Sequence, residues 1–444
     1  LKQLAGDDDF REYGLDPAAV AVAEPNLVRQ QWVKKSQWGW NPRLDLEHER
    51  GRHSLGGSFY YFDSDHWGQV AWVEGVSDPS YNPRHRYYRY FGDKVEANLF
   101  AQEYLRLTDR LSGQATAMLR YQKYDFEQVR MGVYRGYTYD VDWLFFSPRL
   151  GLTYELAPQV NLFTSFAVSS RTPTDATIYD ANDPYIMPSL EVLAVSTDST
   201  RWDFGDPTAS AERVYDIEFG GTYRQERLAL DLNLYWMEFR DEILPYGAVD
   251  DDGLRRSVNA DRSVHAGIEL SARGQVTRAL GLQGNFSYAY NRVRDFAGQV
   301  DFYDVDADTA GLLSVDFADK VVPGFPEYLG NLLLDYRPGR FRINWQHQFF
   351  GRQYMDLGNT EEYSIEPYYT SSASVSYRLE DVFDAGAVTL SFRVNNLFDK
   401  KYEASGYGGN YALRESNSTA LYGWAEYYVA PERWYFGEIR LDVF

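Results

Sequence analysis

The stretch that decides the fold is Ala387-Val-Thr-Leu-Ser-Phe-Arg-Val-Asn-Asn-Leu-Phe-Asp-Lys-Lys-Tyr402. Apolar and polar side chains alternate strictly from Val388 to Asn395, which is the period of a strand with one apolar and one polar face. The alternation stops at Asn395, where the strand runs out into a loop. The last residues, 434–444, alternate again and close the chain on an aromatic residue. These two segments predict a strand pair at the C-terminal end.

The same pattern recurs along residues 37–444, in about fifteen segments of roughly nine to thirteen residues, the length that a tilted strand needs to cross a bilayer. Short turns such as Arg224-Gln-Glu-Arg227 alternate with long connections such as residues 294–326. Successive connections of an up-and-down barrel fall at opposite ends, so this alternation separates a rim of short turns from a rim of long loops. We therefore predict an all-β fold, a transmembrane antiparallel up-and-down β-barrel with short periplasmic turns and long extracellular loops.

The composition is compatible with this fold and argues against nucleic acid as a partner. The formal net charge is −21, from 44 basic and 65 acidic residues, and such a surface repels the phosphates of nucleic acid. Cysteine is absent, so disulfides and thiolate metal sites are excluded. Aromatic residues make up 17% of the chain, which fits the aromatic girdles of membrane barrels and equally a soluble carbohydrate-binding sandwich.

Several stretches resemble TonB-dependent outer-membrane receptors. In that family an Asn-Leu-Phe-Asp-Lys-Lys-Tyr run leaves the penultimate barrel strand, as in residues 396–402, and the last strand ends on Phe. The segments that also resemble the family are residues 145–154, 162–174, 211–223, 265–270 and 323–331. The resemblance implies a barrel of twenty-two strands, of which about fifteen are visible, behind a plug domain, TonB box and first strands that are not seen. We expect residues 1–36 to be an extracellular loop segment and residues 37–444 the C-terminal part of the barrel.

The resemblance also implies a function. Such a receptor is a multi-pass protein of the bacterial outer membrane that takes up a scarce nutrient, most often a ferric siderophore, energised by TonB through the plug domain. Its other partners would be the small-molecule or chelate cargo, outer-membrane lipid and lipopolysaccharide. Two alternatives stay open, a passive porin-like channel and a soluble all-β carbohydrate-binding or scaffold protein.

No catalytic group can be assigned, so we expect a protein that is not an enzyme. The six histidines are scattered and form no His-x-x-x-His pair, and no nucleophile elbow or phosphate loop is present. We expect no cofactor, except for a structural Ca²⁺ in an acidic loop. The calcium candidates are Asp304, Asp306 and Asp308, although Thr309 and Val315 replace the Gly and Glu of an EF-hand.

Ligand-binding candidates lie in the expected extracellular loops. Aromatic rings in residues 404–433 could stack on the rings or sugar faces of a cargo, and two arginines further upstream could meet an anionic chelate or lipopolysaccharide phosphates. These candidates are Tyr407, Tyr411, Trp424, Tyr427, Tyr428, Arg84 and Arg86. By resemblance, the terminal Phe444 is the assembly signal, although Ile439, Leu441 and Val443 stand on the opposite phase.

Overall fold

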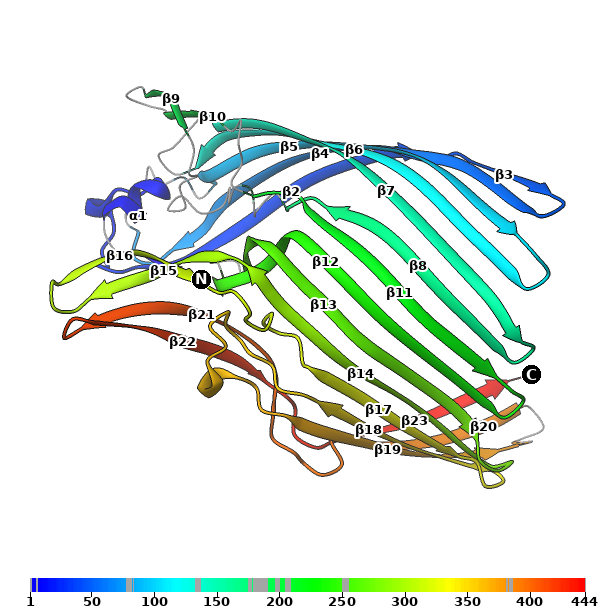
Figure 1. The fold of residues 1–444 in the computed structure, drawn as a ribbon. Helices are drawn as coiled ribbons and strands as arrows, with labels where there is room; N and C mark the ends of the chain where they lie inside the picture. Colours follow the sequence, from blue (N-terminus) through cyan, green and yellow to red (C-terminus); the bar gives the residue numbers. More distant parts are fainter. Residues whose placement is uncertain are drawn as a thin grey trace. The chain divides into compact units, whose positions relative to one another are not determined.

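The computed structural model describes residues 2–4, 7–76, 82, 84–131, 137–174, 178, 191–195, 200–203, 209–249, 255–380, 382 and 386–443. Within them the fold is almost entirely antiparallel β-structure, and no described helix is long and apolar enough to cross a membrane (Figure 1). The chain divides into two compact units, unit 1 (1–104, 115–148 and 170–211) and unit 2 (105–114, 149–169 and 212–444).

Unit 2 is built around consecutive antiparallel strands that are hydrogen-bonded to their neighbours in chain order. Figure 1 shows β11 to β14 as adjacent ribbons coloured green to yellow-green. The strands are β8 (Val160–Arg171), β11 (Glu212–Arg224), β12 (Leu228–Val249), β13 (Arg255–Gln275), β14 (Leu280–Asp295), β17 (Tyr328–Tyr336), β18 (Phe341–Phe350), β19 (Tyr368–Leu379), β20 (Gly386–Asn395) and β23 (Trp434–Val443), together with the second half of β7 (Tyr137–Ala157).

Unit 1 continues the pattern with longer strands. Its strands are β2 (Asn26–Trp40), β3 (Arg43–His48), β4 (Gly51–Val73) and most of β5 (Arg86–Arg106) and β6 (Leu111–Met131), with the first half of β7. β2 and β3 both pair with β4, so they form one strand interrupted at Pro42. If they are counted as one, the strands named for the two units number fifteen within the described residues, as predicted, apart from the two-residue β1 and the strands of two smaller sheets.

The N-terminal segment departs from the expectation of a loop up to residue 36. β2 already begins at Asn26, and it is preceded by β1 (Lys2–Gln3), α1 (Asp7–Glu12) and η1 (Pro17–Ala19). This segment has its own apolar core against the ends of β2, β4 and β5, made of Leu4, Phe10, Tyr13, Leu15, Leu27, Val70, Val73, Tyr87 and Tyr88. A loop prediction was wrong here because pairing with β4, rather than strict alternation in residues 26–36, defines the strand.

The predicted C-terminal strand pair is confirmed. β20 pairs with β23 along its full length, with Leu390 opposite Ile439 and Val388 opposite Leu441. Val388, Leu390, Ile439 and Leu441 therefore share one face of this pair, on which Ile439 and Leu441 are 72% and 66% exposed. Phe444 lies outside the described residues, and the assembly-signal prediction stays a prediction.

The opposite, polar face is also where the alternation predicts it. On β18, Phe341, Ile343 and Phe349 are exposed on the apolar side, whereas Gln348 donates to Asn331 and Asn344 to Ser374 on the polar side. Polar side chains thus satisfy one another across strands, whereas the apolar side chains stay exposed and contact rings on their own side, such as Phe341 with Tyr377 at 4.6 Å between centroids. This division is the one expected for a barrel wall between lipid and a polar interior.

Long and short connections lie at opposite ends of unit 2. Figure 1 shows the short turns, such as β11–β12 and β17–β18, at one end and two hairpins at the other. These hairpins are β15 (Ala297–Asp304) with β16 (Thr309–Asp316), and β21 (Glu403–Glu415) with β22 (Ser418–Val429). The segments expected as irregular loops, residues 294–326 and 404–433, are therefore largely ordered as strands.

Candidate functional site

Four strands at the long-connection end of unit 2 form a small separate sheet, which carries most of the predicted ligand-binding residues. β15 pairs antiparallel with β16 and parallel with β21, and β21 pairs antiparallel with β22. The parallel contact joins two connections that are about a hundred residues apart in the sequence. The sheet is thus a shared structure of two loops.

One face of this sheet packs against residues 355–358, in the connection between β18 and β19 of the same unit. A Cβ atom at Gly408 would lie 3.2 Å from the Cβ of Met355, and one at Gly423 would lie 2.7 Å from a carboxylate oxygen of Asp356. The backbone N–H of Gly358 donates to Asn410 at 2.9 Å. Glycine is required at these positions because the backbone approaches its neighbours too closely for a side chain. Ala412 extends the contact into an apolar cluster that includes Leu244, Val293, Phe317 and Leu357.

The other face presents a row of aromatic rings, which we call the aromatic face: Tyr407, Tyr411, Tyr422, Trp424 and Tyr428. Their register places them on one side, because Tyr411 lies opposite Tyr422 and Gly409 opposite Trp424. The Tyr411 and Tyr422 rings are stacked with centroids 5.5 Å apart, and Tyr407 lies 6.1 Å from Trp424 and 6.2 Å from Tyr428. The Tyr407 hydroxyl donates to Glu426, which fixes the central ring.

Four of the five aromatic residues predicted for this region lie together on the aromatic face, and their role in ligand binding stays a prediction. Tyr427 lies on the other face of the sheet, where it is paired across the strands with Gly406. Partial burial raises the pKa of its hydroxyl. Tyr422 was missed, as was Tyr303 of β15, whose ring meets Tyr411 edge-on at 6.4 Å. The alternation Tyr422, Trp424, Glu426, Tyr428 was the signal that could have found the face.

The two predicted arginines lie in unit 1, at the start of β5. The Arg86 guanidinium lies over the Trp67 ring, 4.8 Å from its centroid. Arg84 is exposed in the turn before the strand, and its backbone N–H donates to Asn82. Arg84 is thus placed for contact with an anion, whereas Arg86 is held against an aromatic ring.

The calcium candidates Asp304, Asp306 and Asp308 lie at the β15–β16 turn, and the first two contact other groups. Asp304 accepts from the backbone N–H of Ala307 and forms an ion pair with Arg414 at 3.5 Å. Asp306 accepts from the backbone N–H of Asn417. Among the described residues these three carboxylates do not form a group of close ligand atoms, and calcium binding stays a prediction.

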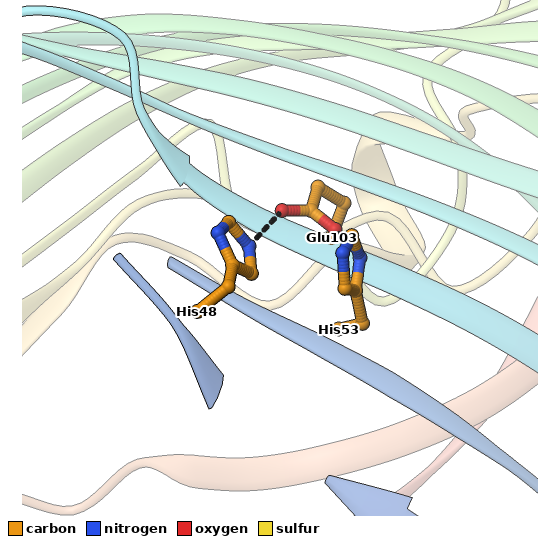
Figure 2. A group of neighbouring side chains, drawn as sticks. All are labelled: His48, His53 and Glu103. Atoms are coloured by element: carbon orange, nitrogen blue, oxygen red, sulfur yellow. Dashed lines mark hydrogen bonds and ion pairs between the residues drawn. The ribbon is translucent and has the colours of Figure 1, made fainter. Parts of the chain in front are cut away.

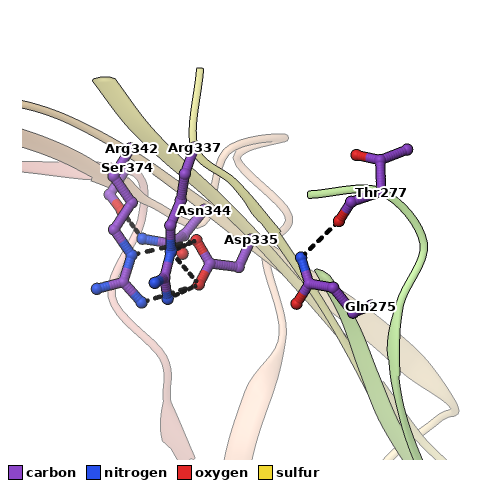
Figure 3. A network of polar contacts seen from close by, with 7 residues as sticks. All are labelled: Gln275, Thr277, Asp335, Arg337, Arg342, Asn344 and Ser374. Atoms are coloured by element: carbon purple, nitrogen blue, oxygen red, sulfur yellow. Dashed lines mark hydrogen bonds and ion pairs between the residues drawn. The ribbon is translucent and has the colours of Figure 1, made fainter. Parts of the chain in front are cut away.

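A second feature lies at the short-turn end of unit 2, on the polar face. A cavity of about 750 Å³ is lined by six arginines, Arg224, Arg227, Arg273, Arg278, Arg337 and Arg342. Figure 3 shows the Arg337 and Arg342 guanidinium groups directed at the Asp335 carboxylate. Their nitrogen atoms lie 2.5 Å and 3.0 Å from a carboxylate oxygen of Asp335. Glu226 and Asp335 are the acidic residues in the lining, so this cavity is positively charged in a chain of net charge −21. The short turn Arg224–Arg227 is evident from the sequence, but its proximity to Arg337 and Arg342 is evident only in the structure.

Comparison with known proteins identifies the fold family. The family model described as "TonB dependent receptor-like, beta-barrel" matches residues 3–397. The chain belongs to this family. This family consists of transporters and receptors of the outer membrane and is not an enzyme family.

Solved structures show the same fold at low sequence identity. The ferric yersiniabactin uptake receptor FyuA from Yersinia pestis matches with a TM-score of 0.59 and 15% identity, over 93% of this chain and 54% of that one. The siderophore receptor PiuA from Acinetobacter baumannii has a TM-score of 0.59 and 14% identity, over 91% and 56%. The copper transporter OprC has a TM-score of 0.62 and 14% identity, over 96% and 58%. The chain therefore spans little more than half the length of these TonB-dependent structures.

Proposed function

We propose that this chain is the barrel portion of an active-transport receptor that takes up a ferric siderophore, energised by TonB through a plug domain. The observation that carries the cargo proposal is the aromatic face at the long-connection end. The family supports the transport role, and the similar solved structures include a ferric yersiniabactin uptake receptor and a siderophore receptor.

The exposed apolar face supports a position in the outer membrane. Leu232, Leu234 and Trp236 follow one another along β12, and each is between 39% and 49% exposed. Burying apolar area stabilises by roughly 25 cal/mol per Å², so such a continuous surface is stable in lipid rather than in water. The short turns would then lie on the periplasmic side and the aromatic face outside the cell.

The aromatic face suits a cargo with planar groups. Its rings offer stacking surfaces, and the hydroxyls of Tyr411, Tyr422 and Tyr428 offer hydrogen bonds at the ring edges. Its rear glycines and Met355 hold the sheet in place, so the rings are presented on a fixed backbone. Catecholate siderophores, whose iron is held by oxygen atoms carried on aromatic rings, are the class that this chemistry fits best.

Binding to the full-length receptor in detergent tests the proposal. Quenching of tryptophan fluorescence would be titrated with ferric catecholate, hydroxamate and carboxylate siderophores. We expect saturable catecholate binding, weakened about three- to tenfold in Tyr411→Ala and in Tyr428→Ala, because each loses a stacking surface.

Tyr427→Ala is the matched control, since this tyrosine lies on the opposite face of the same strand and should leave the affinity unchanged. Equal losses in all three variants would indicate a general collapse of the sheet. Absence of binding by every ferric siderophore would overturn the cargo assignment, and uptake that persists without TonB would support a passive channel.

A further inference from the structure

Two histidines and a glutamate come together in unit 1, at the short-turn end of β3, β4 and β5. His48 and Glu103 are 3.0 Å apart between Nε2 and Oε1, and His53 Nδ1 contacts the other carboxylate oxygen. The two imidazole rings are stacked, with centroids 4.6 Å apart and planes inclined by 27°. Figure 2 shows both rings converging on the Glu103 carboxylate from the β3–β4 hairpin.

Strand register explains why these side chains meet. His48 pairs with Gly51, and Leu46 with His53, so the two histidines are diagonal neighbours across the hairpin. Alternation places them on the same face as the exposed Leu44, Leu46 and Leu55. Glu103 shares the phase of Leu99, another strongly exposed apolar residue of β5. The cluster therefore lies on the apolar side of these strands, next to the β3–β4 turn.

We propose that His48, His53 and Glu103 bind a divalent transition-metal ion, with Zn²⁺ as the best fit. Two imidazoles and one carboxylate are the ligand set of three-ligand zinc sites that keep a fourth position for water. One ligand atom from each residue lies within 4.8 Å of the others. Among the described residues, these three form the group of His, Cys, Asp or Glu side chains that is close enough to hold a metal ion. A tetrahedral site with bonds of about 2.1 Å needs its ligands about 3.4 Å apart, so rotation of the exposed side chains closes the site.

The contacts of the three side chains without a metal are compatible with metal binding. Each histidine now contacts one carboxylate oxygen, and the metal would replace the proton shared in each contact. The backbone N–H of Arg50 donates to His48 Nδ1 at 3.3 Å. Coordination through Nε2 puts a proton on Nδ1 and releases this bond, which an exposed turn residue can exchange for water.

A metal here would connect two pieces of backbone. His48 and His53 belong to the β3–β4 hairpin and Glu103 to β5, so the bound ion would fasten the hairpin tip to the neighbouring strand. Hydrophobic burial cannot do this, since the surrounding leucines are exposed. The site would thus stabilise the edge of unit 1 without taking part in cargo binding.

The test is Zn²⁺ binding by the full chain in detergent, followed by competition with a chromophoric chelator. Co²⁺ would replace Zn²⁺ in a second measurement, because its visible absorption reports nitrogen ligation. We expect one Zn²⁺ per chain, and a loss of affinity of at least about tenfold in His48→Gln and in His53→Gln, since even loss of an outer-shell partner costs about 10–100-fold.

His347→Gln is the control, because His347 contacts Ser371 in unit 2 and belongs to no three-ligand group among the described residues. Glu103→Gln, which keeps the shape of the side chain, tests the carboxylate if a histidine variant fails to fold. Absence of stoichiometric binding in the wild-type chain, or unchanged affinity in folded His48→Gln, His53→Gln or Glu103→Gln protein, would overturn the proposal. So would a Co²⁺ spectrum without nitrogen ligation.

Discussion

At the scale of single residues, His85 links the N-terminal segment to β5. Its ring lies against Gly14, where a Cβ atom would be only 2.6 Å from the imidazole and where φ is +69°. Only glycine fits this left-handed position at no cost. Burial, with a smaller contribution from nearby Arg130, lowers the pKa of His85, whose interaction with the backbone of Glu12 acts in the opposite direction.

This pKa shift predicts a pH-dependent attachment of residues 7–15. Because the folded state disfavours the charged imidazole, the unfolded segment binds more protons, and the stabilisation is present above about pH 6.5 and lost as the pH falls towards the lowered pKa. Hydrogen exchange of these amides should accelerate between about pH 7.5 and pH 5 beyond the change in intrinsic rate. His85→Phe keeps a ring of similar size but cannot be protonated, so it should remove the additional acceleration of exchange at low pH. An unchanged pH profile in this variant would contradict the assignment of the effect to His85.

At the scale of elements, the alternation of apolar and polar residues was sufficient to predict those strands that have one apolar and one polar face. β18 and β20 were predicted from it because their two faces differ in chemistry. The first part of β2 was taken for a loop because residues 26–36 mix Lys34 and Lys35 with apolar residues, and the extension of the strand depends on pairing with β4. The β21–β22 hairpin was read as a loop because its glycines, which the packing on Met355 requires, resemble turn residues.

The docking of this hairpin can be tested at Gly408. A valine there would meet the carbonyl oxygen of Trp424 at 2.2 Å as well as Met355, so Gly408→Val should destabilise the hairpin by about 1–3 kcal/mol. Hydrogen exchange should speed up in β21 and β22 and stay slow in β12 to β14. Gly437→Val in β23 is the control, since nothing lies within 4 Å of its Cβ position. Equal exchange in the two variants would argue against the proposed packing.

At the scale of the whole molecule, the residue types of a site were easier to predict than their partners. The aromatic residues of 404–433 were recognised, but the separation of Tyr427 from the others follows from a register that no single segment reveals. The proximity of His48, His53 and Glu103 depends on the register of one hairpin and on a third strand, which the sequence alone does not show. Likewise, the six arginines of the cavity come from several turns.

The proposed membrane position makes a prediction for the intact protein. The exposed leucines and aromatics of the apolar face should require detergent for extraction, and the folded protein should migrate differently on SDS gels before and after boiling. A long antiparallel sheet resists SDS at room temperature because its backbone hydrogen bonds are satisfied within the sheet. Recovery in the soluble fraction, or identical migration, would favour the soluble all-β alternative.

The two-faced hairpin has a consequence for how such a receptor diversifies. Positions on its underside are constrained by Met355, Gly358 and Asp356, whereas substitutions at 411, 422 and 428 change the presented chemistry and leave that contact intact. Mutational drift can therefore explore new cargoes one residue at a time, with little risk to folding. An insertion of a single residue in β22 would instead exchange the two faces, so we expect variation among descendants by substitution and not by change of length.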